Sequence, residues 1–475
     1  MSTYTSHSPD SLEQSDLNFY QLAAIQLNIR SNAGLTFPAT AAPGTIASLW
    51  YRTIATHGAH LQVGLARLAN EPTKARPILV RQPLNTTTAG AASKLTFAPP
   101  VLAKLQGRPM EEILVSNLYS EPDLPITGPA VLYIFTNDDD EDPKAVALMV
   151  NLCAALWDAT TMRSIFQTFM NLLESQTSTI YKSPSTKDLY TQLGGWEERI
   201  QEEASNEKNI SDPLFLQMGE NIVAITDILK GPPATSPIER RISATLEAKV
   251  VEGCRRVMDS HGVTLEGLTN ACFVYALAET YFRERATTTN EPSSVTLVQT
   301  TQLDPRTLLG DNGHSSGSTN HNNRYIQAIG TISQASNVTK KEWTETSQSS
   351  SLVVDWLVAE AKRADADRQV RLQRGEGLHR TVELATGQID RNHSVAACLE
   401  VVDHGIYNTP SEDYEIELGH RMDICPHMTI VVHMERASGK RKLQVQLGIE
   451  QGREATLQWL ERCIELWKEV AACSS

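Results

Sequence analysis

The hydrophobic pattern is most informative between residues 130 and 175. Residues 145–153 are apolar at almost every position, which predicts a strand buried on both faces. The apolar run 130–135 lies on the other side of the acidic turn 137–143, so the two runs predict an antiparallel pair. Directly afterwards, apolar residues recur at helical spacing and predict a helix capped by Thr160 or Thr161. Its apolar face consists of Met162, Ile165, Phe166, Phe169, Met170 and Leu173.

Helical spacing and strand-like alternation of apolar residues predict further elements on both sides of this segment. Helical spacing predicts helices at 45–68, 243–258, 264–283 and 457–467. Between the second and third of these, Gly262 can adopt the left-handed conformation that ends a helix. Alternating and β-branched runs predict strands at 295–303, 428–435 and 442–449, the last two forming a hairpin.

Polar stretches without apolar periodicity predict connections. Residues 176–215 are rich in Ser, Thr and Glu and predict a linker between two lobes, and 310–323 and 339–351 have the composition of long loops. The predicted domains are therefore an N-terminal lobe at 1–175, the linker at 176–215, and a C-terminal lobe at 216–475. Helices and strands are mixed in both lobes, so the fold class is α/β or α+β, with the default ligand site between the lobes.

Composition narrows the class of protein. The chain has 475 residues, 41% hydrophobic and 21% charged, which excludes disorder throughout. Its 42 Lys and Arg against 56 Asp and Glu give a net charge of −14, and no basic stripe is present, so nucleic acid is not an expected partner. The sequence contains neither a signal-peptide pattern nor an apolar run long enough to span a membrane. We expect a soluble, cytoplasmic monomer.

Motifs for metals and common cofactors are missing from the sequence. The seven cysteines are scattered without a CxxC pair, and His314 and His321 have no ligand spacing, so we expect no disulfide framework and no metal site. The acidic run Asp138–Asp142 is best explained as a solvated turn. No GxSxG, GxxxxGK[ST] or GxGxxG motif occurs, and we therefore expect no cofactor.

One carboxylate stands out at a junction of predicted elements. Asp158 lies in the short turn between the buried strand 145–153 and the helix that follows it. A carboxylate in such a turn is poorly solvated and needs a cationic partner. Arg306, which follows the predicted strand 295–303 in the segment Asp304-Pro-Arg, is a plausible partner.

The order of these features resembles the superfamily of BAHD enzymes, condensation domains and chloramphenicol acetyltransferases, and within it the fungal O-acetyltransferases of the trichothecene type. The shared order is a helix near Trp50, a strand-turn-helix at residues 145–174, a linker, two helices, a strand ending in Asp-x-Arg, and a closing hairpin and helix. The resemblance implies two acetyltransferase-like lobes that form a pseudo-dimer around a central tunnel.

In that superfamily the turn reads His-x-x-x-Asp, where the histidine is the general base and the aspartate pairs with a downstream arginine. The resemblance assigns the structural pair to Asp158 and Arg306, but Ala154 stands at the histidine position. Alanine has no titratable group, so the ~10²–10⁴-fold contribution of a positioned base is lost. The candidate tunnel residues are Cys153, Ala154, Trp157, Gln299, His427 and His433. His433 has an alternative interpretation as a histidine satisfied at a sheet surface.

Three functions are compatible with an apolar tunnel that lacks a base. The first is a tailoring enzyme of fungal secondary metabolism, a Diels-Alder-type cyclase that holds an apolar terpenoid or polyketide in a reactive conformation. Trp157, Gln299 or His427 would polarise a carbonyl of the substrate. The second is a CoA-dependent O-acyltransferase that uses another base. The third is a non-catalytic pseudoenzyme in which Asp158 and Arg306 only hold the lobes together.

Overall fold

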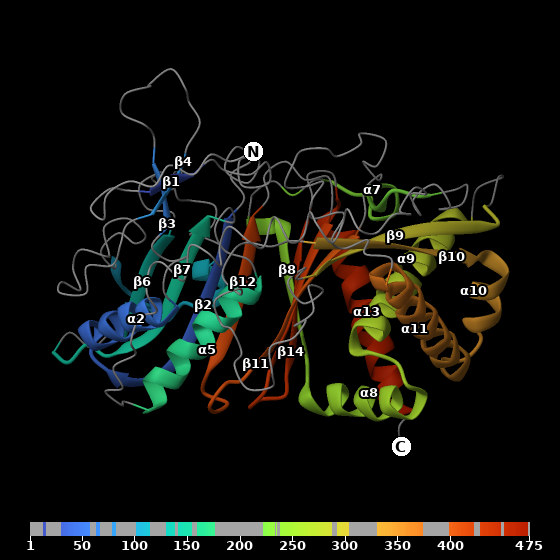
Figure 1. Cartoon of the computed structure of the whole chain (residues 1–475). Coiled ribbons are helices and arrows are strands. Elements are labelled where there is room, and N and C mark those ends of the chain that lie inside the picture. The colour runs from blue at the N-terminus through green and yellow to red at the C-terminus, as the bar shows by residue number, and fades with distance from the viewer. Residues whose placement is uncertain are drawn as a thin grey trace.

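The computed structural model describes residues 13–15, 30–57, 63–66, 78–81, 101–114, 130–137, 141–153, 159–175, 222–232, 234, 238–286, 292–303, 330–373, 399–421, 428–447 and 451–473. These residues form two large sheets with helices packed against them, one in each half of the molecule (Figure 1). A small third sheet contains β1 (Glu13–Ser15), β4 (Ile78–Arg81) and β3 (Val63–Ala66).

The N-terminal sheet confirms the antiparallel pair predicted from the sequence. Its strand order is β12 (Glu415–Arg421), β2 (Arg30–Ala41), β7 (Ala145–Cys153), β6 (Ala130–Thr136) and β5 (Val101–Lys104). The helices α2 (Pro43–His57) and α5 (Ala159–Ser175) cover one face of this sheet. Their aromatic residues Trp50, Phe166 and Phe169 are fully buried in the core between helices and sheet.

The C-terminal sheet has its helices on one face only within the described part of the chain. The strand order is β10 (Gly330–Thr339), β9 (Ser294–Leu303), β11 (Leu399–Tyr407), β13 (Met428–Glu435), β14 (Arg441–Gln446) and β8 (Arg241–Leu246). Around it lie α7 (Ile225–Ile228), the 3₁₀ turn Ile238–Arg240, α8 (Ala248–His261), α9 (Leu265–Arg285), α10 (Lys340–Thr346), α11 (Ser350–Gln373) and α13 (Arg453–Ala472). The predicted hairpin is confirmed as β13 and β14.

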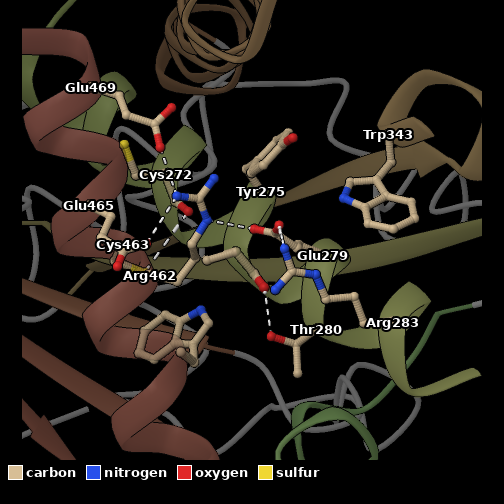
Figure 2. A network of polar contacts seen from close by, with 12 residues as sticks. Cys272, Tyr275, Glu279, Thr280, Arg283, Trp343, Arg462, Cys463, Glu465 and Glu469 are labelled. Carbon is tan, nitrogen blue, oxygen red and sulfur yellow. Dashed lines mark hydrogen bonds and ion pairs between the residues drawn. The ribbon is translucent and has the colours of Figure 1, made fainter. Parts of the chain in front are cut away.

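Most of helix α9 is buried on all sides, because it lies between the sheet and the other helices. It carries one buried carboxylate, Glu279, which is only 4% exposed. Glu279 accepts hydrogen bonds from Nε of Arg462 on α13, at 2.7 Å, and from Arg283, at 2.5 Å (Figure 2). Arg462 in turn binds Glu469 at 2.7 Å. The network thus satisfies a charge that burial would otherwise make costly, and it ties α9 to α13.

The two halves are joined by a strand exchange. β12 belongs to the C-terminal half of the sequence but pairs with β2 along its whole length, and it is coloured orange beside the blue β2 in Figure 1. The backbone of its Ile416 is held by β13 and β14: the N–H donates to Glu435 at 2.8 Å, and the carbonyl accepts from His433 and Lys442. The edge of the N-terminal sheet is therefore anchored to the face of the C-terminal sheet.

A second connection links α5 to β11. Arg163 donates to the carbonyl of His404 at 2.9 Å, and one turn later Gln167 exchanges two hydrogen bonds with the backbone of Asn408. Gly405 has a φ of +70°, and a Cβ at this position would collide with the Arg163 guanidinium. Glycine therefore suits position 405 for two reasons: it adopts this φ without strain, and it leaves room for the Arg163 guanidinium.

Several predicted elements need correction. The interval 45–68 is not one helix, because α2 ends at His57 and β3 follows; the sequence has glycines at 58 and 64, which disfavour a helix interior. The predicted helix 243–258 begins later, since Arg241–Leu246 pairs with β14 as β8. Thr160 and Thr161 lie within α5 and do not precede it.

The stretch 339–351 was expected to be a loop but is mostly helical. Thr339 and Glu342 form a reciprocal capping box that starts α10, and α11 begins at Ser350. Polar residues at a helix start satisfy free N–H groups, so polarity alone does not indicate a loop. The predicted stretches 176–215 and 310–323 lie outside the described residues. The division into two linear domains remains a prediction. β12 does not follow it, because this strand belongs to the predicted C-terminal domain but pairs with β2 in the N-terminal sheet.

We predict that Gly405→Ala destabilises the protein by more than Gly107→Ala. Both glycines have positive φ, which costs alanine roughly 1–2 kcal/mol. A methyl group at position 405 also displaces Arg163 from the carbonyl of His404, whereas nothing lies within 4 Å of the position that a Cβ would take at Gly107. Urea denaturation measures both losses. In an Arg163→Met background the additional loss at Gly405 should disappear, and equal losses in the parent protein would contradict the prediction.

Candidate functional site

The candidate site is bracketed by described elements, although its central turn is not described. Ala154, Trp157, Asp158, Arg306 and His427 lie outside the described residues, and the predicted pair Asp158–Arg306 stays a prediction. Cys153 is the last residue of β7, and α5 begins at Ala159. The strand-turn-helix predicted from the sequence therefore has its strand and its helix in the expected places.

Two buried asparagines lie beside the end of β7. Asn32 on β2 and Asn151 on β7 are directly opposite each other in the sheet, and both are fully buried. The Nδ2 of Asn32 donates to the carbonyl of Leu114 at 2.9 Å, while its Oδ1 has no hydrogen-bond partner among the described residues. The face that leads to the turn is therefore polar at its end.

The contacts of α5 show which part of the C-terminal sheet lies near this turn. Arg163 binds the carbonyl of His404 and Gln167 binds Asn408, so α5 and β11 run in the same direction. Ala159, one helical turn before Arg163, must lie toward the beginning of β11. The residue of interest there is Glu400, the second residue of β11.

Glu400 points away from the helices of its own half. Its neighbours Leu399 and Val401 belong to the core under those helices, so strand alternation places Glu400 on the opposite face. On that same face, Val402 and Val431 pack into the core that contains α5. Glu400 therefore faces the N-terminal half, at the end of β11 from which α5 starts.

Neutral side chains surround this carboxylate. Gln302 Nε2 on β9 donates to Glu400 Oε1 at 2.6 Å, and Thr429 Oγ1 on β13 donates to Oε2 at 3.1 Å. Next to them, the hydroxyls of Thr300 and Ser333 are 2.9 Å apart. These five residues, from four adjacent strands, form a polar cluster that we call the Glu400 cluster.

The register settles where the candidate Gln299 points. It lies opposite Gln334 on β10 and Leu399 on β11, and both of those face the helices. Gln334 Nε2 donates to the carbonyl of Ala364 on α11 at 2.7 Å. Gln299 is therefore on the helix-covered face, which corrects its expected position beside the N-terminal half. Thr300, one residue later, is on the face where Gln299 was expected.

His433 lies at the junction of the sheets. Its ring is 1% exposed, its Nε2 donates to the carbonyl of Ile416 at 3.1 Å, and Tyr407 packs edge-on against it. Burial lowers the pKa of His433 well below its ordinary value, and the nearby Lys442 adds to this effect. The imidazole is therefore neutral, and its described contacts are with protein groups.

A charged cluster next to His433 stabilises the junction. Lys442 Nζ binds Glu417 at 2.6 Å and Glu435 at 3.3 Å, and Arg241 lies 3.5 Å from Glu417. Burial raises the pKa of Glu417, and the two cations act against this effect. Each carboxylate here has a cationic partner, in contrast to the Glu400 cluster.

Solved structures of other proteins share this architecture. The trichothecene 15-O-acetyltransferase from Fusarium sporotrichioides matches with a TM-score of 0.65 and 12% sequence identity, over 99% of this chain and 98% of that chain. The first condensation domain of the CDA synthetase matches with a TM-score of 0.63 and 13% identity, over 97% and 96%. The epimerization domain from the third module of tyrocidine synthetase B matches with 0.60 and 13%, over 99% of both chains.

The chain has the condensation-domain fold. This confirms the fold class and the resemblance inferred from the order of sequence motifs. No protein-family model matches the chain, and no curated protein matches it by sequence. At 12–13% identity the structural likeness establishes the fold, and the chemistry has to be argued from the residues of this chain.

The described residues of this condensation-domain fold contain neither a metal cluster nor a membrane-spanning helix. The described residues contain no group of three or more His, Cys, Asp or Glu side chains arranged to hold a metal ion. Within the same residues, no helix is both long and apolar enough to cross a membrane. The described free cysteines are Cys473, which is exposed, and Cys254, Cys272 and Cys463, which are buried; burial raises the pKa of these last three thiols. They are unreactive as nucleophiles.

Sequence reasoning missed the Glu400 cluster. The available signal was a single carboxylate inside the apolar run 395–402, which is costly to bury unless it has partners. Those partners, Gln302 and Thr429, are distant in sequence and become neighbours only through strand pairing.

We predict that His433 makes the protein sensitive to mild acid. A buried histidine with a lowered pKa stabilises the fold above the unfolded-state pKa of 6.5, and this stability is lost as the pH falls below it. The loss is up to about 1.4 kcal/mol per pH unit. His433→Gln, whose amide can still donate to Ile416, should have a shallower pH dependence between pH 7.5 and 5 in chemical denaturation. Parallel curves for both proteins would refute this role of His433.

Proposed function

We propose that this chain is a tailoring enzyme of secondary metabolism that promotes ring closure of an apolar, flexible small molecule. The observation that carries the proposal is Ala154: a chain with the condensation-domain fold has no imidazole at the position where the resemblance assigns the general base. The names of the similar structures, an O-acetyltransferase and condensation domains, support a small-molecule substrate. The fungal terpenoid or polyketide class is part of the same proposal.

A pericyclic ring closure suits a site without a base. In a Diels-Alder-type reaction, a diene and an alkene form two carbon–carbon bonds, and no proton is transferred. The protein contributes by selecting the conformer in which the reacting carbons approach each other. A hydrogen-bond donor beside a conjugated carbonyl lowers the barrier further, and Trp157 and His427 remain the proposed donors. Gln299 is not proposed for this role, because it lies on the helix-covered face of its sheet.

The test uses purified protein without any CoA thioester. A panel of linear polyenes, each with a 1,3-diene and an activated alkene, is incubated with the protein, and products of unchanged mass are sought by chromatography and mass spectrometry. We expect at least one substrate to close more than about 100-fold faster than in buffer, the scale of a conformational contribution. Heat-denatured protein is the control. No acceleration for any member would refute the proposal for this substrate class.

A second experiment asks whether position 154 can support acyl transfer. Ala154→His should gain acetyl transfer from acetyl-CoA to an alcohol, by about 10²–10⁴-fold over the parent protein, because it restores a base. Release of free CoA thiol reports the reaction. Acetyl transfer by the unmodified chain would contradict ring closure as the main activity.

One observation favours acyl transfer as a second candidate function. Glu400 faces the N-terminal half at the end of β11 nearest to the start of α5, so a carboxylate is available where a base would be useful. Acyl transfer with this carboxylate as base predicts CoA release by the parent protein and its loss in Glu400→Gln. Under the ring-closure proposal, the parent protein releases no CoA.

A further inference from the structure

The Glu400 cluster differs from other carboxylate sites of the same half. Glu417 and Glu435 bind Lys442, Glu360 binds Arg363, and Glu279 binds Arg462. Among the described residues, no cationic side chain forms an ion pair with Glu400. Its two hydrogen bonds come from the amide of Gln302 and the hydroxyl of Thr429.

This arrangement holds the carboxylate in place, and the described residues leave some of its acceptor positions unoccupied. An ionised carboxylate has about four lone-pair positions, and the two described donors occupy one on each oxygen. Glu400 is partly exposed, whereas Thr429 is 2% exposed and is fixed in the sheet. The side chain is therefore preorganised to receive a hydrogen-bond donor from outside the protein.

The chemistry of the cluster indicates the kind of donor. Its other members are neutral hydroxyls and an amide, and the next apolar residues on the same face, Val402 and Val431, are buried in the core that contains α5. A single carboxylate among neutral hydrogen-bonding groups matches a ligand O–H group, and the apolar remainder of the ligand is taken from the proposed function.

We propose that Glu400 is a substrate-binding residue that accepts a hydrogen bond from a hydroxyl group of an otherwise apolar small molecule, with Gln302 and Thr429 as its positioning residues. The proposal rests on the proposed function for the general class of ligand, and it adds the hydroxyl group as a recognition element. This role of Glu400 does not depend on whether the bound molecule then undergoes ring closure or acyl transfer.

The test compares two probes that differ only in the donated proton, farnesol and farnesyl methyl ether. Both have the same apolar chain and an oxygen, but only farnesol can donate to a carboxylate. Affinities are measured by ligand-observed NMR titration without any turnover. A hydrogen bond to a charged acceptor is worth roughly tenfold or more in affinity, so we expect the parent protein to prefer farnesol by about tenfold.

Variants separate the role of Glu400 from general damage. Glu400→Gln keeps the size of the side chain and should reduce the preference for farnesol to about twofold, and Glu400→Met should abolish it, with the affinity for the ether unchanged in both. Thr429→Val should reduce the preference by about threefold, as expected of a positioning residue. Glu252→Gln, an exposed glutamate on α8, is the matched control and should keep the full preference. Circular dichroism confirms that each variant is folded.

The outcomes distinguish this inference from the proposed function. Equal affinities of the parent protein for the two probes, or a preference for farnesol that survives in Glu400→Met, would overturn the inference, as would the absence of saturable binding of either probe. A preference that depends on Glu400, together with no ring closure of any polyene, would support the hydroxyl site and reject only the cyclase.

Discussion

The N-terminal sheet depends on a strand that comes from the other half of the sequence. Without β12, β2 would be an edge strand with a row of unpaired backbone groups, and unpaired buried groups are costly. The position of β12 is fixed by the buried side chains of Glu435, His433 and Lys442, which bind the backbone of Ile416. Backbone pairing on one side and buried polar side chains on the other thus set how the two sheets meet.

This junction has consequences for charge. Burying Glu417, Glu435 and Lys442 is tolerable because the cation lies between the two carboxylates, and the lysine and the carboxylates offset part of one another's desolvation cost. Burial alone would lower the pKa of Lys442, but Glu417 and Glu435 reverse the effect and raise it. Charges at this junction are therefore neutralised within the protein. Glu400, on the same face of the sheet, is bound only by neutral donors among the described residues.

Local periodicity predicted those helices and strands whose apolar residues recur without interruption, because one or both of their faces are buried along the whole element. β6, β7, β9, β13, β14, α5 and α9 all have such patterns, and each is present close to its predicted bounds. Most of β8 fell within a predicted helix, because a run of six residues is too short to distinguish helical from strand periodicity. Its pairing with β14 shows that it is a strand. Helix α10 was missed because a capping box is polar. β11 contains Glu400 and Asp403 within an apolar run, which obscured its alternation.

The sequence by itself determined the identity of the residues at the strand-turn-helix: Ala154 where the superfamily motif has histidine, and Asp158 four residues later. It also determined the order of elements, which was enough to indicate the fold. Only the tertiary structure decided that Gln299 faces the helices and Thr300 the N-terminal half, and that Glu400 lies beside Gln302 and Thr429. The physical reason is that period two shows which residues of a strand share a face, whereas pairing with distant strands determines what each face meets.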